Sequence, residues 1–201
     1  MIIKHLGKTP NIHPKAFIAP STTICGDVKI GKNSCILFGS SIIAEGGRIE
    51  IGDNCIILEN AVIRSSAKHS TIIGNNTLIG PNAHVVGCTL EECVFIATGA
   101  SIFHGAKIGA RSEVRINCVV HIKTNIPPDT TIPINWVAVG NPAKIFQPHE
   151  HEKIWEVQKP LNFPNFVYGV ERPKKGKSNM PEITKRYSMI FRKHKDDEIL
   201  F

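Results

Sequence analysis

The sequence predicts an all-β solenoid, a parallel β-helix followed by a C-terminal α-helix, from three observations. Aliphatic residues recur every six positions, a small or compact residue follows most of them four positions later, and glycine often comes directly after the aliphatic, as in "IGKNSC" and "IGDNCI". A period of six cannot hold one face of a helix with 3.6 residues per turn. Hexads that each form one short strand and one corner instead stack into coils, with the aliphatic side chains pointing inward.

The hexad register defines the expected coils. The aliphatic residues stand at positions 18, 24, 30, 36 and 42, then 51, 57 and 63, then 73, 79 and 85, then 90, 96, 102, 108, 114, 120 and 126. Three- and four-residue insertions around "GGR" and "SAKHS" and one single-residue deletion account for the irregular steps. Three hexads complete a turn, so about six coils are expected, beginning at Ile18, Ile36, Ile57, Ile79, Ile96 and Val114.

The two ends of the chain lie outside the repeat. Residues 1–17 are expected to form an N-terminal lead-in, and residues 18–146 the β-helix and its closing segment, "IPINWVAVGNPAKIF". Residues 147–160 are expected to form the C-terminal helix, because Pro148 suits a first turn, Glu152 suits the positive end of the helix dipole, and Pro160 ends the helix. Low hydrophobicity and charge predict an extended basic tail over residues 161–201.

The distribution of charge and apolar residues argues against nucleic-acid binding and membrane association. The net charge of +7 comes from the ends, because residues 18–131 and 132–170 each carry equal numbers of basic and acidic residues. A neutral body has no basic face to follow a phosphate backbone, so no nucleic-acid partner is expected. The chain has no apolar run long enough to cross a bilayer, and "MIIKHLGKTPNIHPK" lacks the apolar stretch and cleavage site of a signal peptide. No membrane association and a cytoplasmic location are therefore expected. The six cysteines form no CxxC pair and are expected to be reduced packing residues.

From about residue 12 to 170 the chain resembles the gamma-class carbonic anhydrase family of hexapeptide-repeat proteins. The resemblance rests on the hexads, on "IIAEGGRIEIGDNCIILENAVI" and "IIGNNTLIGPNAHVVGC", and on "WVAVGNPAKI" before a terminal helix. It implies a left-handed coil and a homotrimer. In active members three histidines hold zinc between neighbouring subunits.

The resemblance places those three ligand positions at Arg64, Pro81 and Val86. Arginine stays protonated, proline has no donor atom to spare and valine is apolar, so no metal is expected there. Zinc-dependent CO2 hydration requires three protein ligands and an open coordination position. That activity is therefore expected to be absent, and no cofactor is expected, with zinc or acyl-CoA as alternatives.

The remaining histidines leave two enzymatic alternatives open. His104 and His121 lie near adjoining corners of the coil and form an alternative metal pair, while His84 has no mapped partner. Hexapeptide-repeat acyltransferases use one histidine as a general base at a subunit seam, and His84, His104 or His121 is the candidate for that role, with an acyl-CoA donor.

The interpretation preferred from the sequence is a homotrimeric scaffold or small-ligand binder. Positions near the former zinc site read Phe38, Leu58, Val86 and Phe103, so the seam between subunits is expected to be apolar. The basic tail, with "RPKKGK" and "YSMIF", is a candidate for docking on a protein partner.

Overall fold

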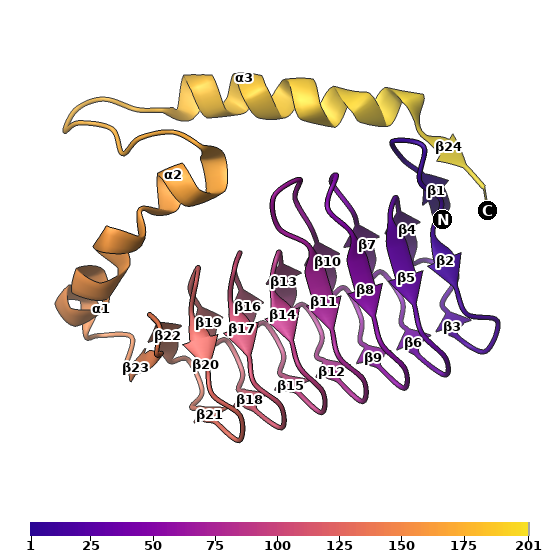
Figure 1. The fold of residues 1–201 in the computed structure, drawn as a ribbon, viewed down its shortest axis with the longest axis horizontal. Coiled ribbons are helices and arrows are strands. Elements are labelled where there is room, and N and C mark those ends of the chain that lie inside the picture. Colours follow the sequence, from indigo (N-terminus) through magenta and orange to yellow (C-terminus); the bar gives the residue numbers. More distant parts are fainter. Residues whose placement is uncertain (201) are drawn as a thin grey trace.

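The chain winds into a left-handed parallel β-helix with three sheets. A computed structural model describes residues 1–200 (Figure 1). The ten-stranded sheet contains, in spatial order, β23 (Lys144–Phe146), β22 (Val137–Val139), β19 (Val119–Val120), β16 (Ser101–Ile102), β13 (His84–Val86), β10 (Val62–Arg64), β7 (Ser41–Ile43), β4 (Thr23–Cys25), β1 (Ile2–Lys4) and β24 (Glu198–Ile199).

Two seven-stranded sheets form the other faces. The β2–β20 sheet contains β2 (Asn11–Ile12), β5 (Val28–Ile30), β8 (Ile49–Ile51), β11 (Thr71–Ile73), β14 (Thr89–Leu90), β17 (Lys107–Ile108) and β20 (Asn125–Ile126). The β3–β21 sheet contains β3 (Phe17–Ile18), β6 (Cys35–Ile36), β9 (Ile56–Ile57), β12 (Leu78–Ile79), β15 (Phe95–Ile96), β18 (Glu113–Val114) and β21 (Thr131–Ile132). The predicted fold class is confirmed.

The coil is longer than the six turns expected from the hexads. Seven turns of three strands are complete, and β22 begins an eighth. Residues 1–17, expected as a lead-in, supply β1 and β2, and the partly buried Ile2 and Ile12 pack against the core. Ile132 adds an inward position after Ile126. The count was too low because hexads at both ends keep the inward aliphatic while their other positions depart from the pattern.

The hexad aliphatics form the core. From Ile24 to Ile126 every one of them is at most 2% exposed, and each stacks on its equivalent in the next coil, as Ile57, Ile79 and Ile96 do along one sheet. Asparagines at corners, such as Asn54 and Asn76, have positive φ values. Asparagine tolerates this left-handed conformation better than most residues, which explains its recurrence in the repeat.

The closing segment and helix follow the coil. β23 pairs antiparallel with β22, and α1 (His151–Gln158) continues into a 3-10 turn, η1 (Lys159–Leu161). Ile154 is the buried residue of α1, and the Arg172 guanidinium lies 4.8 Å from the centre of the Trp155 ring. The C-terminal helix predicted from the sequence is therefore present, beginning three residues after Pro148.

Residues 161–201, expected as an extended tail, are folded where the structure describes them. They form α2 (Phe163–Tyr168), α3 (Met180–Phe191), a 3-10 turn η2 (Arg192–Asp196) and β24. α3 runs back along the coil, so that both chain ends lie at the same end of the molecule (Figure 1). β24 pairs antiparallel with β1, and Lys4 Nζ lies 2.7 Å from Glu198 Oε2. The tail orders because it carries apolar and aromatic side chains between its charges.

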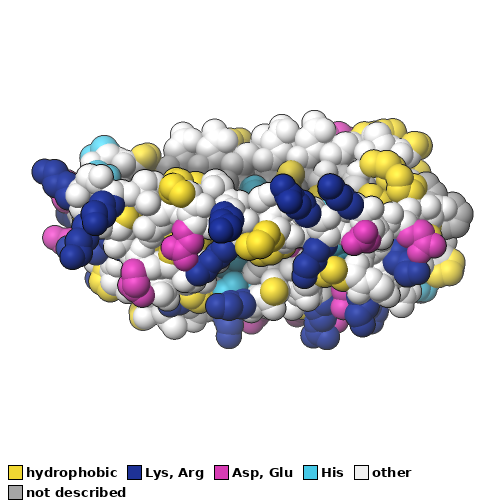
Figure 2. Space-filling model, turned by 90° about the horizontal axis from the view of Figure 1, so that it is seen from above, with side chains coloured by type: hydrophobic (Ala, Val, Ile, Leu, Met, Phe, Trp, Pro, Cys, Tyr) yellow, Lys and Arg dark blue, Asp and Glu magenta, His cyan; other side chains and the backbone are white. Residues whose placement is uncertain are grey.

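The helix-covered side of the molecule has a mixed surface. Basic side chains are scattered over it with acidic and apolar ones among them (Figure 2). Within residues 1–200, none of the helices has the length and apolarity needed to cross a bilayer.

The stacked core gives a first prediction. Replacing Ile96, which is fully buried, with alanine should lower the free energy of unfolding by about 2–5 kcal/mol, because the lost methyl groups leave a cavity. Ile72 points outward on the β2–β20 sheet, and Ile72→Ala should cost less than about 1 kcal/mol. Urea unfolding followed by circular dichroism measures both; equal costs would contradict the inward stacking.

Candidate functional site

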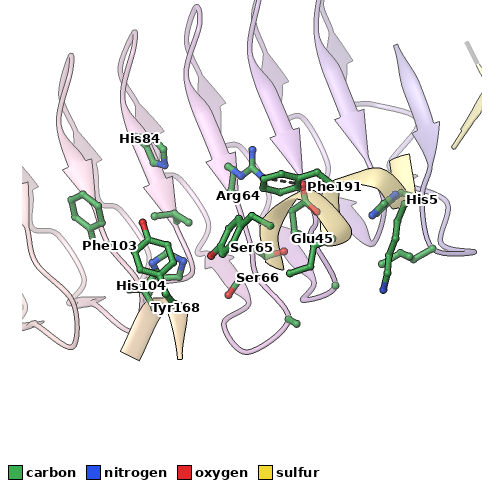
Figure 3. Close-up of a pocket in the computed structure, with 18 of the residues that line it drawn as sticks. His5, Glu45, Arg64, Ser65, Ser66, His84, Phe103, His104, Tyr168 and Phe191 are labelled. Carbon is green, nitrogen blue, oxygen red and sulfur yellow. Dashed lines mark hydrogen bonds and ion pairs between the residues drawn. The ribbon is translucent and has the colours of Figure 1, made fainter. Parts of the chain in front are cut away.

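A cavity of about 490 Å³ lies between the ten-stranded sheet and the folded tail. Side chains of β10, β13 and the corner after β16 line the coil side, and α2 and α3 line the opposite side (Figure 3). The chain therefore builds both walls of this cavity itself.

An aromatic row from α2 and α3 forms the tail side of the cavity. The rings of Tyr168 and Tyr187 meet edge to face at 5.6 Å between centres, and those of Tyr187 and Phe191 at 5.3 Å. Phe163 contacts Tyr168 at 5.9 Å and Phe103 of the coil at 6.2 Å. Such edge-to-face pairs add to the stabilisation from burial and fix the orientation of the rings.

Arg64 lies on the coil side with its charge already paired. Its Nη2 donates to Glu45 Oε1 at 2.8 Å, and its guanidinium lies 5.8 Å from the centre of the Phe191 ring (Figure 3). The side chains of Glu45 and Arg64 are 10% and 30% exposed, so the ion pair is partly shielded from solvent. The contact with Phe191 joins α3 to β10, and the ion pair compensates the Arg64 charge at the cavity wall.

His84 and His104, two of the sequence candidates, both line the cavity. Burial, followed by the nearby His69 and His84 imidazoles, lowers the pKa of His104 to about 4, and its buried Nδ1 has no hydrogen-bond partner. Burial and then the Arg64 charge lower the pKa of His84. The His104 ring fits because Gly87 leaves room: a Cβ at Gly87 would lie 2.8 Å from His104 Cδ2.

His121, the third candidate, is not among the residues that line this cavity. Its ring centre lies 5.8 Å from that of Phe163 and 6.5 Å from that of Phe103. Its buried Nδ1 also lacks a hydrogen-bond partner, and burial lowers its pKa. The pairing of His104 with His121 around a metal stays a prediction.

The residues at the three positions assigned to zinc by resemblance do not suit a metal ion. Arg64 is a protonated donor bonded to Glu45, Val86 is apolar and 6% exposed, and Pro81 has no free donor atom. Arg64 and Val86 are nevertheless directly paired across β10 and β13, and both line the cavity. The cavity thus covers two of the three positions.

A second cluster of polar side chains lies where the chain ends meet. We call it the terminal cluster: His5, Cys25, His194 and Asp197, each of which offers one ligand atom within 4.8 Å of the others. Among residues 1–200 it is the one group of three or more histidine, cysteine or acidic side chains with this geometry. His5 and Cys25 are each 2% exposed.

The sequence analysis did not single out the terminal cluster. Two of its members, His194 and Asp197, lie in the segment expected to be an extended tail. The available signal was Ile199 and Leu200 directly after "HKDDE". These two apolar residues indicate a short strand, and its pairing with the first strand of the coil brings the preceding polar residues to His5 and Cys25.

The fold and its stacked hexads define a hexapeptide-repeat protein with a left-handed β-helix. No protein-family model matches the chain. A carbonic anhydrase from Geobacillus kaustophilus is 30% identical over 159 residues, which are 79% of this chain and 84% of that protein. Mitochondrial gamma carbonic anhydrase 1 from Arabidopsis thaliana is 31% identical over 167 residues, 80% of this chain. The chain belongs to the gamma carbonic anhydrase-like family.

The match to the plant relatives is partial in length. The chain spans 58% of gamma carbonic anhydrase 1 and 53% of gamma carbonic anhydrase 2 from Arabidopsis thaliana. Among solved structures, a putative acetyltransferase from Bacillus cereus is similar with a TM-score of 0.60 and 26% identity, covering 76% of this chain and 87% of that one. A hexapeptide transferase family protein from Anaplasma phagocytophilum gives a TM-score of 0.52 and 26% identity, covering 79% of this chain and 91% of that one.

The lowered pKa of His104 gives a second prediction. A histidine whose pKa is lower in the folded state than its ordinary value of about 6.5 stabilises the fold less as pH falls from 6.5 toward 4, because the unfolded chain takes up the proton first. The difference in melting temperature between pH 7 and pH 4.5 should therefore shrink in His104→Gln, whose side chain does not titrate. An unchanged difference would contradict the buried neutral state, as would a pKa near 6.5 from NMR titration of the His104 ring.

Proposed function

We propose that this family member binds a small, largely apolar molecule in the cavity and does not hydrate CO2 through zinc at Arg64, Pro81 and Val86. The observation that carries the proposal is the cavity itself: aromatic side chains of the chain's own tail enclose the coil surface that bears Arg64 and Val86. Binding sites for small molecules are typically concave, mostly apolar and provided with a few polar groups, as this cavity is.

The polar groups of the cavity define the ligand further. His104 is neutral at pH 7, and its Nδ1 is a buried nitrogen without a partner. Arg64 is neutralised by Glu45. The neutral His104 ring and the paired Arg64 favour a ligand without net charge that carries a hydrogen-bonding group, such as a hydroxyl or carbonyl, for the few polar side chains of the lining.

Acyl transfer from an acyl-CoA donor is the second candidate, supported by the likeness to the putative acetyltransferase. The titration of the cavity histidines favours binding over this reaction. A general base works best with a pKa near the working pH, whereas the pKa of His104 is about 4 and that of His84 is also lowered. A turnover lost in His84→Ala or His104→Ala, together with CoA binding, would move acyl transfer to first place.

Filling the cavity tests the binding proposal. Nile red, a neutral and mostly apolar dye, should bind the purified protein with one site per chain and increased fluorescence. Val86→Trp places a large ring in the cavity wall and should weaken that binding at least about tenfold. Ile72→Trp adds the same ring to the outer face of the β2–β20 sheet and should leave the affinity unchanged.

Two results would overturn this assignment. The first is equal Nile red affinity in both tryptophan variants, provided that circular dichroism shows both folded. The second is efficient zinc-dependent CO2 hydration by the purified protein, since Arg64, Pro81 and Val86 offer no ligand set for that reaction.

We also propose that the chain assembles as a homotrimer through the β3–β21 sheet. The outward residues on its first five strands are Phe17, Cys35, Ile56, Leu78 and Phe95, which stand in register from coil to coil. Phe17 is 50% exposed, and Ile56 and Phe95 are each 38% exposed. The equivalent row on the β2–β20 sheet reads Asn11, Lys29, Glu50, Ile72, Thr89, Lys107 and Asn125.

The β3–β21 sheet is apolar on its outer face and the β2–β20 sheet is polar, which supports the β3–β21 sheet as the interface between subunits. A contiguous apolar row on a monomer surface marks a contact with another protein, whereas the charged row is typical of a face left in water. A second copy of this chain suits the apolar row because flat prism faces pack side by side.

A charge on the apolar row should break the trimer. Phe95→Asp is expected to shift the mass measured by light scattering after size exclusion from three chains toward one, since an unpaired carboxylate would be buried in the interface. Lys107→Asp makes a similar change on the β2–β20 sheet and should leave the mass unchanged. A trimer that survives Phe95→Asp, or a monomeric wild type, would contradict the proposed interface.

We also propose that the protein is cytoplasmic and that its tail has a protein partner. All six cysteines are free, as expected in the reducing cytoplasm. The tail packs on the coil of its own chain through Phe163, Phe166 and Phe191, so a protein partner would contact the outer side of α3.

A further inference from the structure

The terminal cluster is a hydrogen-bonded group whose members come from both ends of the chain. Asp197 Oδ1 lies 2.5 Å from His5 Nδ1, and Asp197 Oδ2 lies 2.7 Å from His194 Nδ1 and 3.9 Å from Cys25 Sγ. The His5 and His194 rings stack with their centres 4.1 Å apart. Two imidazoles, one thiol and one carboxylate thus converge on one point.

We propose that the terminal cluster is a structural site for one transition-metal ion, with zinc as the natural occupant. Zinc takes four nitrogen, sulfur and oxygen ligands in a tetrahedron, with bonds of about 2.0–2.3 Å that place the ligand atoms roughly 3.3–3.7 Å apart. The ligand atoms of the cluster already lie within 4.8 Å of one another, so small side-chain rotations suffice.

The residues around the cluster prepare it for an ion. His194 Nε2 lies 3.1 Å from Glu45 Oε1, and Glu45 in turn accepts from Arg64. With Nε2–H donating to Glu45, His194 can ligate through Nδ1 once zinc displaces the proton by which Nδ1 bonds Asp197 in the ion-free cluster. A hydrogen bond from the second ring nitrogen commonly orients metal-binding histidines. Glu45 is therefore a positioning residue and not a ligand.

The ligand types select zinc over calcium or magnesium. Thiolate and imidazole suit zinc, whereas calcium and magnesium prefer sets of oxygen ligands. Without an ion the Cys25 thiol is protonated, since burial, followed by the Asp197 and Glu45 charges, raises its pKa to about 12. Binding replaces that proton, which passes to the solvent.

Four protein ligands make a closed site, which is typical of structural and not catalytic zinc. The ion would join the residue after β1 and strand β4 to η2 and the residue before β24, and so fasten the end of the tail over the first two turns. The site adjoins the cavity assigned to ligand binding, because His5 and Glu45 also line that cavity. Zinc binding and dye binding are measured independently, so either assignment can fail without the other.

The test uses the full-length protein without a histidine tag, stripped of metal with EDTA and titrated with Zn2+ against a chromophoric chelator. One Zn2+ per chain should bind with a dissociation constant below about 0.1 µM. Co2+ in place of zinc should give tetrahedral absorption bands and a thiolate-to-cobalt charge-transfer band in the near ultraviolet.

Variants assign the ligands. Cys25→Ala should abolish the charge-transfer band and weaken Zn2+ binding at least about 100-fold. His194→Ala should weaken Zn2+ binding by a similar factor. Glu45→Gln should weaken binding about 10–100-fold while retaining the charge-transfer band, because it removes a partner of a ligand and not a ligand. Cys93→Ala and His149→Ala alter an exposed cysteine and an exposed histidine far along the chain and should change neither signal.

A dissociation constant above 0.1 µM for the wild type overturns the proposal, because the cluster would then be only a hydrogen-bonded network. A charge-transfer band that persists in Cys25→Ala also overturns it, by placing the ion elsewhere. The wild-type titration needs no substitution, so a variant that fails to fold does not remove the test.

Discussion

The structure depends on one constraint: each hexad must place an aliphatic side chain in the interior, directly over its equivalent in the preceding coil. Ile57, Ile79 and Ile96 illustrate the resulting column. Because each coil contacts only its neighbours, the stability of the solenoid is close to a sum of the stabilities of single coils and of the interfaces between adjacent coils. The constraint fixes the inward position of every hexad and leaves the outward positions free to differ between the three faces.

That freedom explains how one scaffold carries three different surfaces. The β3–β21 sheet bears an apolar row, the β2–β20 sheet bears a polar row, and the ten-stranded sheet is partly covered by the chain's own tail. Position 86 shows the division within one strand, since Val85 points into the core while Val86 faces the cavity. The family relationship describes the inward residues well, whereas the function proposed here depends on the outward ones.

The sequence predicted the periodic part of the molecule and missed what is not periodic. The hexads predicted the fold class and the buried aliphatics from Ile24 to Ile126, and the start and stop signals at Pro148, Glu152 and Pro160 predicted the helix after the coil. They could not reveal the terminal cluster, because His5 and Asp197 are 192 residues apart and meet only through the pairing of β24 with β1. The sequence predicted one side of the cavity. His84 and His104 on the coil were recognised as candidates, but the aromatic wall from α2 and α3 lies in a segment whose charge predicted an extended chain.

The antiparallel strands at the two ends of the ten-stranded sheet affect how the protein associates with other copies of itself. A parallel solenoid ends in open sheet edges whose free N–H and C=O groups match the opposite end of another copy, so end-to-end stacking into fibres is its inherent hazard. β24 covers the edge at β1, and β23 folds back over the edge at β22. The returning tail therefore does for the first turn what the closing hairpin does for the last: each ends the growth of the sheet within a single chain.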